Sequence, residues 1–244
     1  MLWAALWGGV AGGASLLGAA AGIRFTASPR LIGGIMAFGA GVLISALAFS
    51  LTREAFDRGG PLAVTVGLAL GALTFFAGDW VLDHHGGRDR KRSHGQAANA
   101  PGSGGFAMAL GALLDGIPES AAIGITLLGG GAVGLPMVTA VFLSNIPEGW
   151  SSAAGMRKSG RSARYILSLW LAVTLASALS ALLGYGLLGY ASPVLIGGVQ
   201  AFAAGAIITM LADTMMPEAY EQGGPVTGLL TAIGFTLSFL VSQF

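Results

Sequence analysis

Residues 27–61 read ASPRLIGGIMAFGAGVLISALAFSLTREAFDRGGP, and the pattern recurs 164 residues later, at 191–225, as ASPVLIGGVQAFAAGAIITMLADTMMPEAYEQGGP. The two copies align without gaps, and 19 of their 35 positions are identical. The shared Ser-Pro pair, the match of Glu54 with Glu218 and the closing Gly-Gly-Pro are not explained by apolar composition. The chain therefore contains an internal repeat, and each copy includes one long apolar segment.

The composition predicts that this repeat lies in a lipid bilayer. Of the 244 residues, 54% are hydrophobic and only 9% are charged, whereas soluble proteins carry about 25% charged residues. The mean hydropathy is +0.76, and the 41 glycines lie mainly within apolar runs, where small residues let membrane helices approach closely. We expect an all-α integral membrane protein. The net charge of +1 argues against a nucleic-acid partner, and the lack of cysteine excludes thiolate metal sites.

Eight segments are long enough to cross about 30 Å of hydrocarbon as helices. The repeat copies contain the second and the seventh, which are five crossings apart, so the copies enter the membrane from opposite faces, as in many secondary transporters. We expect a 3+2+3 inverted repeat: residues 1–83 form one half, 84–105 a loop, 106–156 two central helices and 157–244 the other half. The expected spans are 2–23, 31–51, 62–81, 106–128, 135–156, 165–188, 193–216 and 226–244.

Basic residues predict the orientation of these spans. Ten of the twelve lie in the connections after the first, third and fifth spans, and the other two, Arg53 and Arg58, follow the second. By the positive-inside rule those three connections are cytoplasmic. We therefore expect a multi-pass protein of the cell (inner) membrane, with both termini extracytoplasmic and loop 84–105 in the cytoplasm.

Each of the two central spans contains Ile-Pro-Glu near its middle. The first reads LLDGIPESAAIG over residues 113–124, and the second reads FLSNIPEGWSSA over residues 142–153. A proline inside a helix lacks an N–H and clashes with the carbonyl four residues back. Pro118 and Pro147 therefore predict kinks that free backbone oxygens at mid-membrane.

Polar side chains flank both prolines. Asp115 and Glu119 are four residues apart and share a helix face, as do Ser144 and Glu148, and Asn145 lies beside the second pair. Each charge at the bilayer centre costs about 2.5 to 3.5 kcal/mol, and a divalent cation compensates for it with oxygen ligands. The sequence predicts a metal site formed by these five residues. The alternative is that the prolines are packing kinks and the acids are protonated or hydrogen-bonded.

These features together resemble the ZIP (Zrt/Irt-like) family of divalent metal transporters. The resemblance covers essentially the whole chain: eight spans, a His-containing loop after the third, the 3+2+3 repeat and two Pro-Glu helices, with SNIPEG at 144–149 the most specific piece. The family motif in helix 4 is typically His-Asn-x-Pro-Glu-Gly, and helix 5 carries a similar one. This chain has Asp115, Gly116, Pro118, Glu119 and Ser120 in the first motif, and Ser144, Asn145, Pro147, Glu148 and Gly149 in the second.

The chain thus resembles a bacterial member of the family that lacks the usual membrane histidines. Imidazole favours zinc, copper or nickel, so carboxylate and hydroxyl in its place leave manganese, iron(II) or magnesium open beside zinc. Some relatives hold a second metal with an acid in helix 6. Residues 165–188 contain no acid, so we expect a single transport site.

A second polar group lies at the predicted cytoplasmic end. Asp79 and Asp83 end the third span and are followed by His84, and Asp213 lies near the end of the seventh. The resemblance implies that these four residues form an exit site for metal. For the three histidines at 84, 85 and 94 we favour the plainer interpretation, a solvated basic loop that sets the topology.

Two repeat comparisons bear on the remaining acids. Asp213 matches Phe49, so the fold does not require an acid there, and a functional and a structural role are equally open. Glu54 and Glu218 match each other at helix ends, and we favour a structural role for both.

The sequence therefore predicts a transporter, not an enzyme, that takes up a divalent cation such as zinc, manganese or iron by alternating access. The resemblance implies elevator-like sliding of the helices around the central pair. We expect no organic cofactor; the cation and the bilayer are the partners, and a homodimer is left open. Two alternatives remain, a transporter of another cationic solute and an intramembrane metal-dependent hydrolase, which needs an open metal position and a general base.

Overall fold

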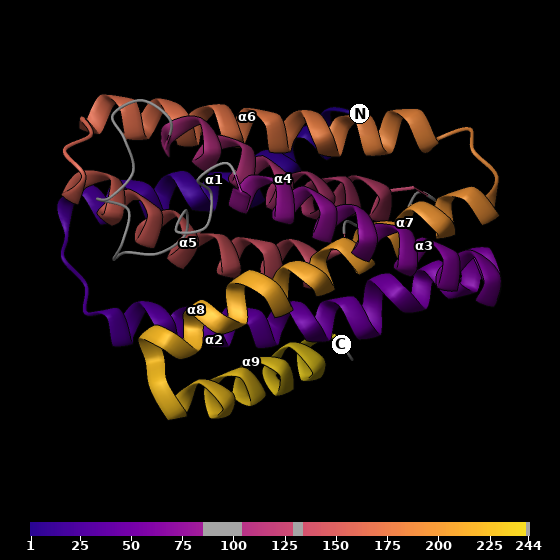
Figure 1. The fold of residues 1–244 in the computed structure, drawn as a ribbon. Helices are drawn as coiled ribbons and strands as arrows, with labels where there is room; N and C mark the ends of the chain where they lie inside the picture. Colours follow the sequence, from indigo (N-terminus) through magenta and orange to yellow (C-terminus); the bar gives the residue numbers. More distant parts are fainter. Residues whose placement is uncertain (85–103, 129–133, 243–244) are drawn as a thin grey trace.

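The computed structural model describes residues 1–84, 104–128 and 134–242, and every regular element in these ranges is helical. Figure 1 shows long helices side by side in a bundle. The elements are α1 (Leu2–Arg24), α2 (Pro29–Ala46), η1 (Leu47–Leu51), α3 (Thr52–Leu82), α4 (Gly104–Thr126), α5 (Leu135–Lys158), α6 (Ala163–Leu188), α7 (Pro193–Met210), η4 (Leu211–Met215), α8 (Met216–Gly223), η5 (Gly224–Val226) and α9 (Thr227–Val241).

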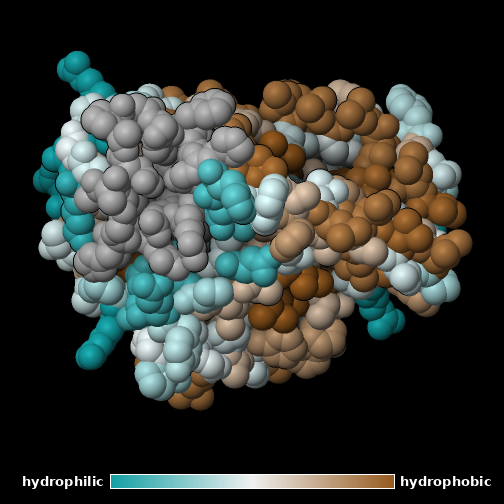
Figure 2. All heavy atoms as spheres, viewed as in Figure 1, coloured by the Kyte–Doolittle hydropathy of each residue, from teal (hydrophilic) through white to brown (hydrophobic). Residues whose placement is uncertain are grey.

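Several of these helices are suited to a membrane. Four helical stretches are long and apolar enough to cross one: Leu2–Arg24, Pro29–Leu82, Ala163–Leu188 and Pro193–Val241. Large apolar side chains such as Leu187 are exposed on the described surface, and Figure 2 shows apolar residues covering much of one face. Extended apolar surface is rare on soluble monomers. The prediction of an all-helical protein compatible with a membrane is confirmed.

The number of separate helices differs from the prediction. Eight separate spans are expected from the sequence, whereas the described residues form six continuous helical stretches. Pro29–Leu82 and Pro193–Val241 each join two expected spans. The joints are at Gly60 and Gly224, which both have φ of 71°. Glycine adopts this left-handed φ without a Cβ clash, and the proline that follows is preorganised to start a helix, so the chain bends without an intervening loop.

The chain reverses direction at both bends. Gly197 of α7 lies against Ala55 and Gly59, before the first bend, whereas the neighbouring Gly198 lies against Gly67, after it. The matching glycines of α2 make the equivalent contacts with α8 and α9, and Figure 1 shows the yellow stretch turning back between these two helices. Each of the two long stretches is therefore a helical hairpin.

The sequence repeat is also a repeat of local structure. The two π-helices, η1 and η4, begin at Leu47 and Leu211, which are repeat partners. Ser28 and Ser192 are both N-caps, and each hydroxyl accepts a hydrogen bond at 3.3 Å from the N–H three residues later. π-Helical turns inside α-helices often mark functional sites. Identical caps, π-turns and bends follow from the residues shared by the two copies.

The helices pack in two groups (Figure 1). In the first, α3 packs along α7, and α2 along α8 and α9, so that the two repeat copies interlock. In the second, α1 packs on α5 and α6, and α4 packs on α6. We call the first set, with η1 and η4, the scaffold group, and the set of α1, α4, α5 and α6 the central group. The groups meet chiefly where α2 contacts α5 and where α7 contacts α4.

Candidate functional site

The acidic residues of the first Ile-Pro-Glu motif lie on α4 inside the protein. Asp115 and Glu119 are each only 2% exposed, and Pro118 lies between them within the helix. The hydroxyl of Ser180 in α6 donates to the backbone oxygen of Ile117 at 2.9 Å. This bond holds α4 against α6 next to the two buried acids.

The polar residues of the second motif lie on α5. Ser144 and Asn145 are buried, and Glu148 is partly buried. The Ser144 hydroxyl donates to Val141 O at 3.0 Å, and the Asn145 amide donates to Ala11 O of α1 at 3.1 Å. This bond links the second motif to α1.

Glycines let neighbouring helices approach the second motif closely. A Cβ on Gly39 of α2 would lie 3.1 Å from the Cα of Ser144. A Cβ on Gly18 of α1 would clash with Ile146 O, and one on Gly149 of α5 would clash with Ser15 O. The backbone around the motif is therefore fixed by direct contact with α1 and with the scaffold group.

The five predicted metal ligands thus come from two helices of the central group. α4 packs mainly on α6 and α5 mainly on α1, and α4 and α5 have little contact with each other. Within the part of the chain that the structure describes, no group of three or more His, Cys, Asp or Glu side chains is placed to hold a metal ion. Four of the five predicted ligands are buried and Glu148 is partly buried, whereas their convergence on one ion stays a prediction.

The structure brings together two of the residues predicted for the exit site. Asp79 of α3 and Asp213 of η4 lie close enough for their charges to interact. Asp83 is the C-cap of α3. His84 instead contacts its own helix, with Nδ1 2.7 Å from Trp80 O and its ring centroid 4.2 Å from that of Trp80. His85, His94 and most of loop 84–105 lie outside the described residues.

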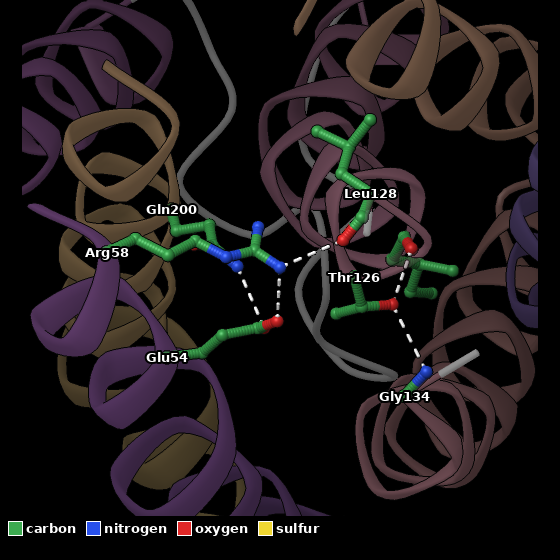
Figure 3. Close-up of polar contacts among 7 residues, drawn as sticks. Glu54, Arg58, Thr126, Leu128, Gly134 and Gln200 are labelled. Carbon is green, nitrogen blue, oxygen red and sulfur yellow. Dashed lines mark hydrogen bonds and ion pairs between the residues drawn. The ribbon is translucent and has the colours of Figure 1, made fainter. Parts of the chain in front are cut away.

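The structure shows a polar cluster, which we call the outer cluster, formed by Glu54, Arg58, Gln200 and the backbone oxygen of Leu128 (Figure 3). The sequence does not predict it as a site. Arg58 Nη2 donates to Glu54 Oε1 at 2.7 Å and to Leu128 O at 2.9 Å, and Gln200 donates to Glu54 Oε2 at 2.9 Å. Gln200 is fully buried. Its signal in the sequence is a polar residue in an apolar span where the other repeat copy has Met36.

The end of α4 next to this cluster is itself hydrogen-bonded. The Thr126 hydroxyl donates to Ile123 O at 2.8 Å and accepts from the Gly134 N–H at 3.2 Å. Figure 3 shows this pair of bonds beside Leu128. Thr126 therefore ties the end of α4 to the start of α5, close to the point where Arg58 reaches Leu128.

The repeat partner of Glu54 forms a second cluster, which we call the inner cluster. Glu218 is 4% exposed and accepts hydrogen bonds at its Oε1 from Ser151 of α5 at 3.0 Å and from Gln222 at 2.7 Å. Both clusters thus link a scaffold helix to other helices. This agrees with the structural role that the sequence favours for Glu54 and Glu218.

Comparison with protein-family models and with curated proteins finds no match to this chain. The class that the fold defines is an all-helical protein with several helices long and apolar enough to span a membrane. The polar residues of α4 and α5 are the features that bear on a narrower function.

Proposed function

We propose that the protein is a divalent-cation transporter similar to the ZIP family and that it carries the ion into the cytoplasm. One observation carries this proposal: Asp115 and Glu119 are almost fully buried on one face of α4, in a chain with only 9% charged residues. Ionisable groups inside a membrane protein are costly and usually functional. Three carboxylates on α4 and α5 are compensated when a 2+ ion binds between them.

The two helical hairpins support eight membrane crossings. Pro29–Leu82 and Pro193–Val241 reverse direction at Gly60 and Gly224, so each stretch crosses twice, and α1, α4, α5 and α6 supply the other four crossings. The basic connections then lie on the cytoplasmic side of the cell membrane. In this topology the ion binds at the midplane, and Asp79, Asp83, His84 and Asp213 lie on its way into the cytoplasm.

The packing of the helices suits an elevator-like transport cycle. All five proposed ligands are on helices of the central group, whereas the interlocked repeat copies form the scaffold group. Sliding of the central group along α2 and α7 would move the bound ion from one side of the membrane to the other. The membrane potential supplies about 2.3 kcal/mol per charge for every 100 mV.

The ligand set favours cations that accept oxygen donors. Asp115, Glu119 and Glu148 offer carboxylates, Ser144 a hydroxyl and Asn145 an amide oxygen, which suit manganese, iron(II) or zinc. The thiolate and imidazole ligands that select for copper are missing from this set.

Uptake into proteoliposomes tests the proposal. Reconstituted protein is offered manganese, iron(II), zinc, cobalt, cadmium and magnesium in turn, and Asp115→Asn and Glu148→Gln are compared with the exposed control Arg53→Gln. We expect uptake of at least one ion, a fall of about tenfold or more in both site variants, as for loss of a charged ligand, and no change in the control. Equal uptake by all three variants would disprove the site. Uptake of an organic cation alone would favour the alternative substrate.

A further inference from the structure

The Arg58 side chain joins the scaffold group to the central group at the end of α4. Its guanidinium Nη2 lies 2.7 Å from Glu54 Oε1, on its own helix, and 2.9 Å from Leu128 O, in the last turn after α4 (Figure 3). Gln200 of α7 holds the other oxygen of Glu54 at 2.9 Å. Arg58 thus connects α3 with the end of α4, and Glu54 connects α3 with α7.

The chemistry of the contact favours a firm tie. Leu128 lies in the turn that follows α4, which ends at Thr126, and a positive charge near the C-terminal end of a helix interacts favourably with the helix dipole. Arg58 supplies both a donor and a charge, and its side chain is only 22% exposed, so water competes weakly for the bonds. The bond to Leu128 O also spans 70 positions of the chain, which makes it a contact between packed helices and not a local turn.

The repeat provides an internal comparison for this contact. The partner of Arg58 is Gln222, which donates to Glu218 at 2.7 Å, and in the inner cluster Ser151 of α5 makes the cross-group bond to Glu218 at 3.0 Å. The outer cluster therefore ties α4 through a guanidinium and a backbone oxygen, whereas the inner cluster ties α5 through a hydroxyl and a carboxylate. The two copies have kept the carboxylate and changed the donor.

We infer that Arg58 is a positioning residue that locks the outer end of α4 onto the scaffold group and sets the balance between two positions of the central group. Any sliding of α4 past α3 and α7 has to break the bond to Leu128 O. The second position of the central group rests on the proposed function, whereas the tie between the two groups rests on the observed bonds.

Distances between the two groups, measured by pulsed electron paramagnetic resonance, test this inference. The chain has no cysteine, so spin labels can be attached to Leu62→Cys in the scaffold group and Leu135→Cys at the start of α5, which are 76% and 55% exposed. The labelled protein is placed in lipid nanodiscs without added metal. Arg58→Gln, which gives the outer cluster the side chain of its repeat partner, is compared with Arg53→Gln.

Arg53 is a matched control because it lies on the same helix but pairs only loosely with Asp57, at 4.0 Å, and its side chain is 77% exposed. We expect Arg58→Gln to raise the population of a second distance by about tenfold, the effect of losing a hydrogen bond to a charged donor, and Arg53→Gln to leave the distribution unchanged. The same distribution in both variants would overturn the inference.

Two further variants keep the test decisive. Arg58→Lys retains the charge and should restore most of the original distribution, which loss of folding would not allow. If Arg58→Gln does not fold, Arg58→Met, which lacks any donor, is compared with Arg58→Lys. A distribution for Arg58→Met that matches both Arg58→Lys and the parent protein would overturn the inference. Because no metal is added, the distances stay informative even if the uptake assay finds no transported ion.

Discussion

The outer and inner clusters begin from the same sequence device and end with different connections. Glu54 and Glu218 are repeat partners, and each accepts a bond from the residue four positions later, Arg58 or Gln222. Arg58 also reaches across to the end of α4, whereas Gln222 stays on its own helix and the hydroxyl of Ser151 makes the crossing. The repeat thus determines where a carboxylate of the scaffold group forms polar contacts. The donors that differ between the two copies determine whether α4 or α5 is linked to it.

The largest effects should come from matched glycines at the helix contacts of the scaffold group. A Cβ on Gly41 would clash with Thr231 O, and one on its partner Gly205 would clash with Leu68 O. We expect Gly41→Val and Gly205→Val to lower the free energy of unfolding by about 3 kcal/mol each through overpacking. SDS unfolding in mixed micelles, followed by circular dichroism, measures this. A large loss at one glycine and none at the other would break the equivalence of the two copies.

Loss of either cluster carboxylate, Glu54 or Glu218, should have the next largest effect on stability. Glu54→Ala leaves the guanidinium of Arg58 without its carboxylate, and Glu218→Ala leaves the donors of Ser151 and Gln222 without theirs. We expect a loss of about 2 kcal/mol for each, the cost of stranding partly buried polar groups. The same unfolding assay separates the clusters, because Arg58→Gln added to Glu54→Ala should recover part of the loss. No recovery in that double variant would show that the Arg58–Glu54 pair does not contribute to the free energy of unfolding.

Substitutions at the two bends should lower the stability less, and by similar amounts at both positions. Gly60 and Gly224 both have φ of 71°, with ψ of −178° and −153°, a region that only glycine adopts readily, and a side chain held there costs about 1 to 2 kcal/mol, the lower part of the range for such conformations. Gly60→Ala and Gly224→Ala should each lower the free energy of unfolding by that amount, with neither substitution meeting a steric clash, since nothing lies within 4 Å of a Cβ at either position. Stabilisation by either alanine would contradict the observed bend at that glycine.

The smallest expected effects are at the helix caps. Ser28→Ala and Ser192→Ala each remove a hydroxyl that accepts from a backbone N–H at 3.3 Å. A lost N-cap costs about 1 kcal/mol, and thermal unfolding in detergent should show similar small decreases for both variants. A threonine at either position retains the cap and serves as the control; if it were as unstable as alanine, the cap would not be the cause.

Much of the scaffold could be predicted from the repeat, because its caps and bends depend on nearby residues. Ser-Pro starts a helix, and Gly-Gly-Pro allows a left-handed turn, wherever the rest of the chain lies. The number of separate helices could not be predicted in the same way, because Gly60 and Pro61 read as a loop although the backbone remains helical on both sides.

In the candidate site, too, features set by nearby residues could be predicted and contacts between distant residues could not. Burial of Asp115 and Glu119 follows from their place in an apolar span. The bond from Arg58 to Leu128 O joins residues 70 positions apart, and the bond from Asn145 to Ala11 O joins residues 134 apart. Such contacts depend on which helices pack together, and the motifs of a single sequence do not specify that packing.

Metal binding to the purified protein tests the central proposal most directly. Equilibrium dialysis against manganese or zinc in detergent should find a single bound ion per chain, with affinity lowered about tenfold or more in Asp115→Asn and in Glu119→Gln, because each loses a charged ligand. Ser28→Ala, far from the motif, should bind as the parent protein does. Binding that is equal in all of these variants would contradict the assignment of the buried acids of α4 to a cation site.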